Sequence, residues 1–406
     1  MRHRVVVTGC GVVCALGNCV PEFAAALRAG RSGVRLVASD PSGPTSVAAS
    51  PHLGPLSDLR APERALFDPV SRYAVHAATE ALEQSGILRE SDVHARTGVY
   101  VGTAMGGMYT IEEAYRDIWY HGAPPKPLAI VCAMANAPAA HLSIRFGLRG
   151  PNITFAAACA SSALAIGEAF NAVRTGRIDS ALVGGAEACV TSGVLRAWHA
   201  MRVLATVDRC APGEACRPFS RDRTGIVLGE GAAMLVLERL EFAQERGAEV
   251  LCELEGFGLS SDASHVCMPA VDGQVAAIVS ALRDADLAPR DIDYINAHGT
   301  ATRVGDIAET RAVHEVFGEH ARDVAISSTK SVHGHLLGAA GALEFVAALL
   351  AMREDFLPAT MHLNLPDADC DLDYVPNQPR EGVRIGHFMS NSFAFGGSNA
   401  VLIAGR

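Results

Sequence analysis

Charged and aromatic side chains are scarce in this sequence: Asp, Glu, Lys and Arg make up 19% of its 406 residues, and Phe, Trp and Tyr make up 6%. Because 49% of the residues are hydrophobic, the chain can bury a large core, and intrinsic disorder is excluded. Positive charge is in deficit, since 34 Lys and Arg face 44 Asp and Glu. A phosphate backbone needs a basic surface, so we expect no nucleic-acid partner.

Paired cysteine motifs are also lacking. The eleven cysteines are an odd number, and no CxxC pair occurs among them. A chain of this length does not need disulfides to stabilise its fold. We therefore expect a reduced, cytoplasmic protein in which most cysteines are small buried hydrophobic residues.

No long hydrophobic run is free of charge. The most apolar segment, residues 336–352, contains Glu344 and two glycines, so we expect a buried helix and no membrane span. The apolar run after Arg4 is interrupted at Gly9 and has no small-residue cleavage pattern. It predicts a buried first strand rather than a signal peptide.

Short β-branched runs that end in glycine alternate with alanine-rich stretches, which is typical of βα layers with mostly parallel strands. The expected strands are 5–8, 98–102 and 180–184, and the expected helices are 273–287, 307–317 and one that starts after Asp68 and stops at Gly86. Residues 39–62 are rich in Pro, Ser and Gly and predict a surface excursion.

The length exceeds that of one core and predicts two core-forming halves. A weak internal similarity of 5–11 to 254–258, and of 182–186 to 395–399, agrees with this.

Cys159 stands between a strand-like segment, 152–155, and an amphipathic helix, 163–175. At a helix N-terminus the helix dipole and the free N–H groups favour the thiolate, which is the nucleophilic form. This position predicts a nucleophile, and a packed core cysteine is the alternative.

Two further segments place histidines near strand ends. His298 follows the strand 294–295 and precedes a glycine, so we expect it to point into a crevice, although a solvated or supporting histidine is the alternative. The segment 327–338 holds Lys330, His333 and His335. Its HxH pair has no third ligand at a recognisable spacing, so we expect no metal.

The fourth segment is 391–399, where a glycine pair follows two phenylalanines. Such a pair can direct backbone N–H groups at an oxyanion, and an ordinary turn between two strands is the alternative. Other glycine groups match no nucleotide-binding pattern. Together the Cys, the two His and the Lys suit acyl transfer, in which a thiolate accepts an acyl group and donors stabilise an enolate.

With these motifs and the further segments 102–107, 217–219 and 229–232, the chain resembles the elongating β-ketoacyl–acyl-carrier-protein synthases of the thiolase-like superfamily over nearly its whole length. The resemblance implies an α/β, thiolase-like fold of two duplicated βαβαβαββ halves in a five-layer α-β-α-β-α core. Residues 1–250 would carry the nucleophile and residues 251–406 the two catalytic histidines.

The implied reaction is decarboxylative Claisen condensation: an acyl chain on Cys159 and malonyl-carrier protein give 3-oxoacyl-carrier protein and CO2, in fatty-acid or polyketide elongation. The alternative within the superfamily is the ketosynthase subunit of a type II polyketide or polyene pathway, acting with a non-catalytic chain-length partner. The retained Cys159 argues against the chain being that non-catalytic partner itself.

The resemblance also implies a role for each matched residue. The catalytic residues would be Cys159, His298, His335, Lys330 and Glu344; the oxyanion hole and gate Cys159, Phe393 and Phe395; the substrate contacts Met105, Thr300, Thr302 and Gly396; and the carrier-docking residues Arg72 and Arg202. No cofactor is expected besides the 4'-phosphopantetheine arm of the carrier protein. A homodimer or a heterodimer with a chain-length-factor-like subunit is implied, without a membrane partner.

The chain departs from the usual family pattern at Ala157, Thr224, Ile226, His333 and Ala394. Ala394 replaces a glycine between the two phenylalanines, and a side chain there restricts the backbone of the gate. We expect Ile226, His333 and Ala394 to bear on gating or acyl-chain preference and not on the chemistry.

Overall fold

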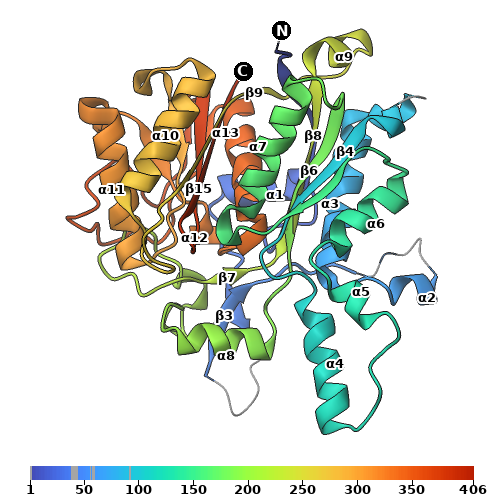
Figure 1. Ribbon diagram of the computed structural model, residues 1–406. Coiled ribbons are helices and arrows are strands. Elements are labelled where there is room, and N and C mark those ends of the chain that lie inside the picture. Colours follow the sequence, from blue (N-terminus) through green and yellow to red (C-terminus); the bar gives the residue numbers. More distant parts are fainter. Residues whose placement is uncertain (1, 38–43, 55, 57–59, 91–92) are drawn as a thin grey trace.

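The computed structural model describes residues 2–37, 44–54, 56, 60–90 and 93–406. Its main feature is a ten-stranded sheet with the order β11-β10-β14-β15-β9-β1-β8-β6-β4-β5, covered by helices (Figure 1). The sheet strands are β1 (Val5–Val13), β4 (Thr97–Gly102), β5 (Asn152–Phe155), β6 (Ser180–Glu187), β8 (Gly231–Arg239), β9 (Cys252–Ser261), β10 (Tyr294–Asn296), β11 (Ala325–Ser327), β14 (His387–Phe393) and β15 (Ser398–Gly405). Smaller sheets hold β2 (Arg35–Val37), β3 (Ser46–Ala49), β7 (Leu228–Gly229), β12 (Phe356–Leu357) and β13 (Arg380–Glu381).

The helices alternate with these strands along the chain. They are α1 (Val20–Arg28), α2 (Ala61–Arg64), α3 (Pro69–Ser85), α4 (Met108–Tyr120), α5 (Ala129–Ala133), α6 (Ala137–Phe146), α7 (Ser161–Arg174), α8 (Ser192–Ala200), α9 (Leu240–Glu245), α10 (Val271–Ala285), α11 (Arg303–Phe317), α12 (Lys330–His333) and α13 (Ala340–Arg353). In the described part of the chain, none of these helices is both long enough and apolar enough to span a bilayer.

The sheet consists of two halves with the same strand order. From the centre outward, the first half runs β1, β8, β6, β4, β5, and the second runs β9, β15, β14, β10, β11. The inner pairs are antiparallel and the outer three strands are parallel in both halves. The halves join where β1 and β9 pair antiparallel, with Val5 opposite Leu254 and Val7 opposite Cys252.

Helices occupy three layers around the two halves. The helices α7 and α13 pack against each other and contact strands of both halves, so they form the middle layer. The helix α3 contacts β1, β8 and β6, while α10 contacts β9 and β15, and these two cover the outer faces (Figure 1). The predicted five-layer, duplicated α/β fold is confirmed.

The middle position of α13 explains its composition. It is buried all round up to Met352, Glu344 included, and a helix that is apolar on every side belongs inside a protein. The sequence interpretation of residues 336–352 as a buried helix is therefore confirmed, although the helix starts at Ala340, after a short 3-10 turn.

Local signals placed most elements correctly. Asp68 caps α3 by accepting a hydrogen bond from the Val70 N–H, and Gly86 ends this helix in the left-handed conformation, with φ of 65°. The first strand continues to Val13, beyond the predicted residue 8, because Gly9 and Gly11 allow α3 to lie close against it.

Two sequence interpretations were wrong. Residues 46–49 form the buried strand β3 and not a surface excursion, while 39–43, 55 and 57–59 lie outside the described residues. The similarity of 5–11 to 254–258 does match equivalent strands, β1 and β9. The similarity of 182–186 to 395–399 does not, because β6 corresponds to β14 and not to the turn before β15.

Candidate active site

Cys159 lies at a sharp connection between β5 and α7. It belongs to a single 3-10 turn, Ala158–Ala160, and Ala158 adopts a left-handed φ of 46°. The Ser161 hydroxyl fixes this turn, since its Oγ accepts from the Ala157 N–H at 2.8 Å and donates to the Ala158 carbonyl at 2.7 Å. The strained elbow turns the Cys159 thiol away from the packed middle layer.

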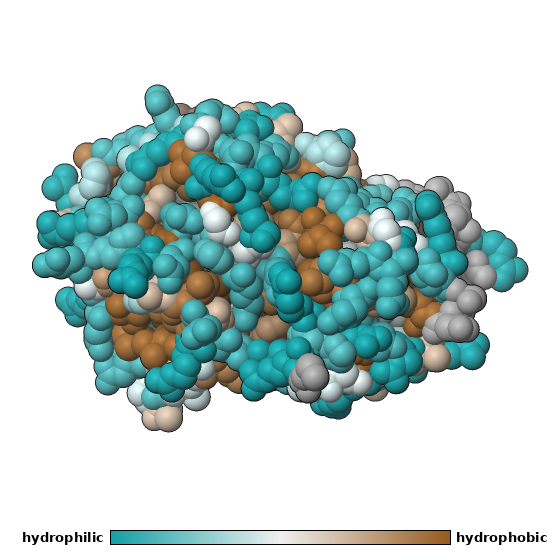
Figure 2. Space-filling view, turned by 90° about the horizontal axis from the view of Figure 1, so that it is seen from above, coloured by the Kyte–Doolittle hydropathy of each residue, from teal (hydrophilic) through white to brown (hydrophobic). Residues whose placement is uncertain are grey.

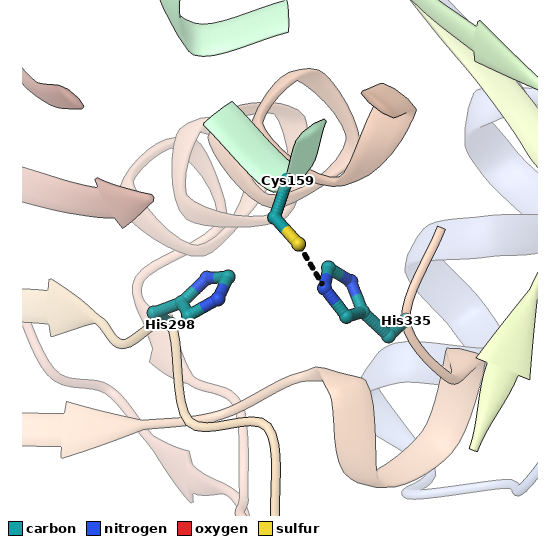
Figure 3. A group of neighbouring side chains, drawn as sticks. All are labelled: Cys159, His298 and His335. Atoms are coloured by element: carbon teal, nitrogen blue, oxygen red, sulfur yellow. Dashed lines mark hydrogen bonds between the residues drawn. The ribbon is translucent and has the colours of Figure 1, made fainter. Parts of the chain in front are cut away.

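Two histidines from the second half reach the sulfur (Figure 3). His298 follows β10 and His335 follows α12, so both come from the carboxyl-end loops of that half. The His335 Nε2 lies 3.0 Å from the Cys159 Sγ, and the two imidazole rings are 5.3 Å apart at an angle of 84°. All three side chains are buried, so the predicted Cys–His–His grouping is assembled across the two halves.

A buried ion pair supports His298. The Lys330 ammonium lies 2.6 Å from a Glu344 carboxylate oxygen, and both side chains are fully buried. The same ammonium lies 3.5 Å from the His298 Nδ1. Because an ammonium can only donate, Nδ1 is the acceptor and the ring proton of His298 resides on Nε2.

Burial decides the charge state of the histidines. It lowers the pKa of His298 and of His335 well below their usual value, and the Lys330 charge adds to this. Both imidazoles are therefore neutral at pH 7, as the sequence predicted from the nearby cation.

Burial decides the state of the cysteine too. It raises the pKa of Cys159 to about 11, although the Lys330 charge and a hydrogen bond from the Phe395 N–H oppose the rise. The expectation that the helix N-terminus favours a resting thiolate was wrong, because desolvation of the sulfur outweighs the helix dipole. The sulfur is a thiol beside a neutral base, His335.

The glycine pair forms the turn between β14 and β15. Gly396 and Gly397 have φ of 86° and 77°, which only glycine adopts without strain. The turn directs the Phe395 N–H at the Cys159 sulfur. Both interpretations of the motif therefore apply: it is a hairpin turn, and it supplies an N–H group to the site.

A cavity of about 400 Å³ opens over these side chains. Its lining includes Cys159, His298 and His335, together with Thr300, Thr302, Phe393, Phe395 and Arg202. Three predicted residues are absent from that lining: Arg72, Met105 and Gly396. Met105 still packs on the apolar cluster that contains Cys159 and Ile226, whereas Arg72 lies on α3.

Two buried glutamates were not predicted as part of the site. Glu309 of α11 accepts from the N–H groups of His298 and Gly299, both at 2.8 Å. Glu187, at the end of β6, accepts from the N–H groups of Ala104 at 2.7 Å and Gly338 at 3.0 Å. The sequence signal was an acidic residue at the end of an otherwise apolar strand, or in a helix directly after a loop that carries chemistry.

His333 and His335 do not form a metal pair. The His333 nitrogens contact the Thr329 Oγ1 at 2.9 Å and the Gly334 carbonyl at 2.7 Å. In the described residues, the group whose geometry could hold a metal is Cys159, His298 and His335, with ligand atoms within 4.8 Å of one another. These atoms are the same ones that a thiol nucleophile and two donors would use.

The duplicated five-layer fold, with a cysteine from one half meeting two neutral histidines from the other, defines a thiolase-like condensing enzyme. The chain matches the family model of the β-ketoacyl synthase N-terminal domain over residues 2–243 and that of the C-terminal domain over residues 251–364. It belongs to the β-ketoacyl synthase family and is an acyltransferase, whose reaction is the decarboxylative formation of a 3-oxoacyl thioester.

Curated and solved relatives agree along the whole chain. Nodulation protein E of Rhizobium leguminosarum bv. trifolii is 44% identical and is covered, like this chain, to 99%. The 3-oxoacyl-[acyl-carrier-protein] synthase 2 of Coxiella burnetii is 41% identical over 100% of this chain and 99% of its own. The structure titled as the ishigamide ketosynthase/chain length factor superposes with a TM-score of 0.92 at 35% identity, covering 100% of this chain and 99% of that one.

Proposed function

We propose that this enzyme elongates acyl chains delivered by an acyl carrier protein, in fatty-acid or polyketide synthesis. Residues 1–250 supply the nucleophile Cys159, and residues 251–406 supply His298 and His335. The observation that carries this assignment is the 3.0 Å contact between the His335 Nε2 and the Cys159 Sγ, beneath an N–H donor from the turn before β15.

In the first step Cys159 takes the acyl group. The thiol proton passes to His335, the sulfur attacks the thioester carbonyl, and the resulting oxyanion accepts hydrogen bonds from the N–H groups of Cys159 and Phe395. When the carbon–sulfur bond to the carrier arm breaks, the departing thiolate takes the proton back from His335. The carrier protein leaves as a free thiol, and the acyl group remains on Cys159.

In the second step malonyl-carrier protein loses CO2. The thioester oxygen of the resulting enolate accepts hydrogen bonds from neutral His298 and His335, which is a donor pair that charged carboxylates could not supply. The enolate carbon attacks the acyl carbonyl on Cys159, and the bond to the sulfur breaks. The product is 3-oxoacyl-carrier protein, and the released thiolate of Cys159 is protonated again.

The remaining predicted residues have supporting roles in this proposal. Lys330, paired with Glu344, keeps His298 neutral and correctly oriented, as their contacts support. Thr300 and Thr302 line the cavity and would contact the phosphopantetheine arm. The other assignments are Met105 and Gly396 for substrate contact, Phe393 and Phe395 for the gate, and Arg202 and Arg72 for carrier docking.

The partners follow from the relatives. A carrier protein is named in the Coxiella relative, and a chain length factor in the ishigamide structure, so a second subunit of either kind, a copy or a chain length factor, fits this fold. No cofactor beyond the carrier's phosphopantetheine is required by these steps. We place the enzyme in the cytoplasm, which the eleven free cysteines support.

Intact-mass measurement with a panel of acyl-carrier proteins tests the assignment. We expect an acyl adduct on the wild-type protein, none on Cys159→Ala, and an unchanged adduct on Cys267→Ala, a matched control because Cys267 is an exposed thiol that lines the same cavity. An equal adduct on Cys159→Ala would refute the nucleophile. His298→Ala should retain acylation and lose condensation with malonyl-carrier protein.

A further inference from the structure

One buried amide in the catalytic cavity has no use in the mechanism above. Gln274 lies in the first turns of α10, is 1% exposed, and lines the same cavity as Cys159 and His298. Its Oε1 has no hydrogen-bond partner within the described part of the chain. A buried amide oxygen without a partner is destabilising, so a residue that only packs would be apolar.

The start of α10 is held rigidly, so Gln274 cannot easily turn away to find a partner. The Ala270 N–H donates to Asp262 at 3.0 Å, and the Ser260 hydroxyl donates to the Gly273 carbonyl at 2.5 Å. A side chain at Gly273 would come within 1.9 Å of the Asp262 Oδ1, which shows how closely the helix start packs on that loop. The amide is therefore preorganised in the cavity wall.

The other buried polar groups of this cavity have partners within the protein. Glu309 accepts from two backbone N–H groups, and the hydroxyls of Thr300 and Thr302 lie 3.0 Å from each other. His298 contacts Lys330. Gln274 differs from them, because the unused hydrogen-bonding capacity of its amide faces the space that a substrate would occupy.

We propose that Gln274 is a substrate-binding residue whose primary amide pairs with a polar group of the thioester substrate that can both donate and accept a hydrogen bond. Two groups have this chemistry: a secondary amide of the phosphopantetheine arm and a hydroxyl on the acyl chain. The inference rests on the proposed function, since it needs a carrier-borne thioester in this cavity.

The test uses Gln274→Met, which keeps the length of the side chain and removes its polarity, with Val279→Ala on the exposed side of the same helix as the control. Steady-state rates are measured with malonyl-pantetheine, with its analogue in which esters replace the amides, and with hexanoyl- and 3-hydroxyhexanoyl-pantetheine as acyl donors. We expect Gln274→Met to raise one KM about fivefold to tenfold at little change in kcat, the effect of one neutral hydrogen bond.

The pattern across substrates identifies the group. If the arm is the partner, the KM difference between wild type and variant appears with amide substrates and disappears with the ester analogue. If an acyl hydroxyl is the partner, the difference appears only with the 3-hydroxyhexanoyl donor. Equal KM values for the two proteins with every substrate would overturn the inference.

Thermal unfolding separates a binding role from a structural one. Because Gln274→Met removes an unpaired buried amide, we expect its Tm to be unchanged or higher. A lower Tm with a uniform loss of activity would assign Gln274 a structural role and overturn the inference. Failure of the proposed function would appear separately, as a wild-type protein that is not acylated. Calorimetric titration with pantetheine then still compares the two proteins, and equal affinities there would refute the arm contact.

Discussion

At the scale of single residues, desolvation is the strongest influence on the site. It keeps Cys159 protonated and both histidines neutral, whereas the helix dipole alone would have favoured a thiolate. The nucleophile must therefore be generated during the reaction, by proton transfer to His335 at 3.0 Å.

Alkylation by iodoacetamide measures this directly. Since the pKa of Cys159 is raised to about 11, we expect its alkylation rate to increase roughly tenfold for each pH unit from about pH 7 to 10. N-acetylcysteine is the reference, and its rate should level off near its ordinary pKa of about 8.5. A rate at Cys159 that levels off below that of the reference would contradict a buried resting thiol.

His333 makes a second prediction at this scale, on stability. Burial, with the Lys330 charge, lowers the pKa of His333 to about 3, so the folded state stays neutral while the unfolded state takes up a proton below its ordinary pKa of about 6.5. Its contribution to stability is present above pH 6.5 and is lost as the pH falls.

His333→Gln removes that proton uptake and can still bond to Thr329. Relative to wild type, the variant should gain about 2 kcal/mol in free energy of unfolding between pH 7.5 and pH 5, at roughly 1.4 kcal/mol per unit. Urea unfolding at the two pH values measures it. A stability difference that does not change with pH would contradict a neutral buried His333.

The residues with chemistry were predictable because motifs set them apart, but their supports were not. Cys159, His298 and His335 stand at strand ends beside small residues, and the structure brings them together. Glu309 and Glu187 act through backbone N–H groups, and any loop backbone offers such groups, so the sequence does not say which glutamate binds which loop.

At the scale of elements, the loops after the strands determine the geometry of the site. Glu309 holds the loop after β10 through two N–H groups, one of them that of His298 itself. We expect Glu309→Gln, which weakens one of the two bonds, to lower kcat of condensation about 10-fold to 100-fold, as for a hydrogen bond to a charged group. Acylation of Cys159 should be unaffected, because that residue lies in the other half. Single-turnover mass spectrometry separates the two steps, and equal losses in both would contradict this role.

The turn before β15 supports a similar prediction. Gly396 has a φ of 86°, and a side chain there would meet open space, so Gly396→Ala tests backbone strain without a clash. The strain costs about 1–3 kcal/mol and tilts the Phe395 N–H away from the sulfur, so acylation should slow about tenfold. The matched control, Gly382→Ala, has φ of 71° and also meets open space, but it lies far along the chain from the site. Equal acylation rates in wild type and Gly396→Ala would remove the oxyanion role of this turn.

At the scale of the whole molecule, the two edges of the ten-stranded sheet differ. The outer strand β11 is buried, and its Ile326 N–H donates to the Asp373 carbonyl at 2.9 Å. The opposite edge strand, β5, is partly exposed, and Ile153 and the neighbouring Ile144 of α6 face solvent. An open apolar edge is a site for strand pairing with another chain.

The same end of the molecule carries most of the large exposed hydrophobic residues. The helix α4 projects from the body with α5 beside it (Figure 1), and the two expose Tyr115, Ile118, Trp119, Tyr120, Ile130 and Val131. The face that holds the termini is mostly hydrophilic, with hydrophobic residues showing between the polar ones (Figure 2). Such a contiguous apolar region marks a protein interface.

We expect the second subunit to bind there, through β5 and the exposed faces of α4 and α5. Ile153→Asp should convert a dimer into a monomer in sedimentation velocity, because it places a charge on the open edge. Val279→Asp, at an exposed position on α10, is the control and should leave the dimer intact. A stable dimer in Ile153→Asp would place the interface elsewhere.

The fold could be predicted at this scale because length and the alternation of strands and helices require two cores. The pairing of the halves could not, because it depends on β1 meeting β9 across about 245 residues, as in the contact of Val7 with Cys252. Residues 46–49 were misread for the same reason: β3 is buried by pairing with β7, a strand far along the chain.

The equivalence of the two halves has a consequence for how such a site can arise. The elbow that carries Cys159 follows the outermost strand of the first half, and the segment that carries His335 follows the outermost strand of the second, so the two occupy the same position in the repeat and meet where the 3-10 turns before α7 and α13 contact each other. A symmetric pair would present two cysteines or two histidines there. Only after the copies had diverged within one chain could that position hold a nucleophile on one side and its base on the other.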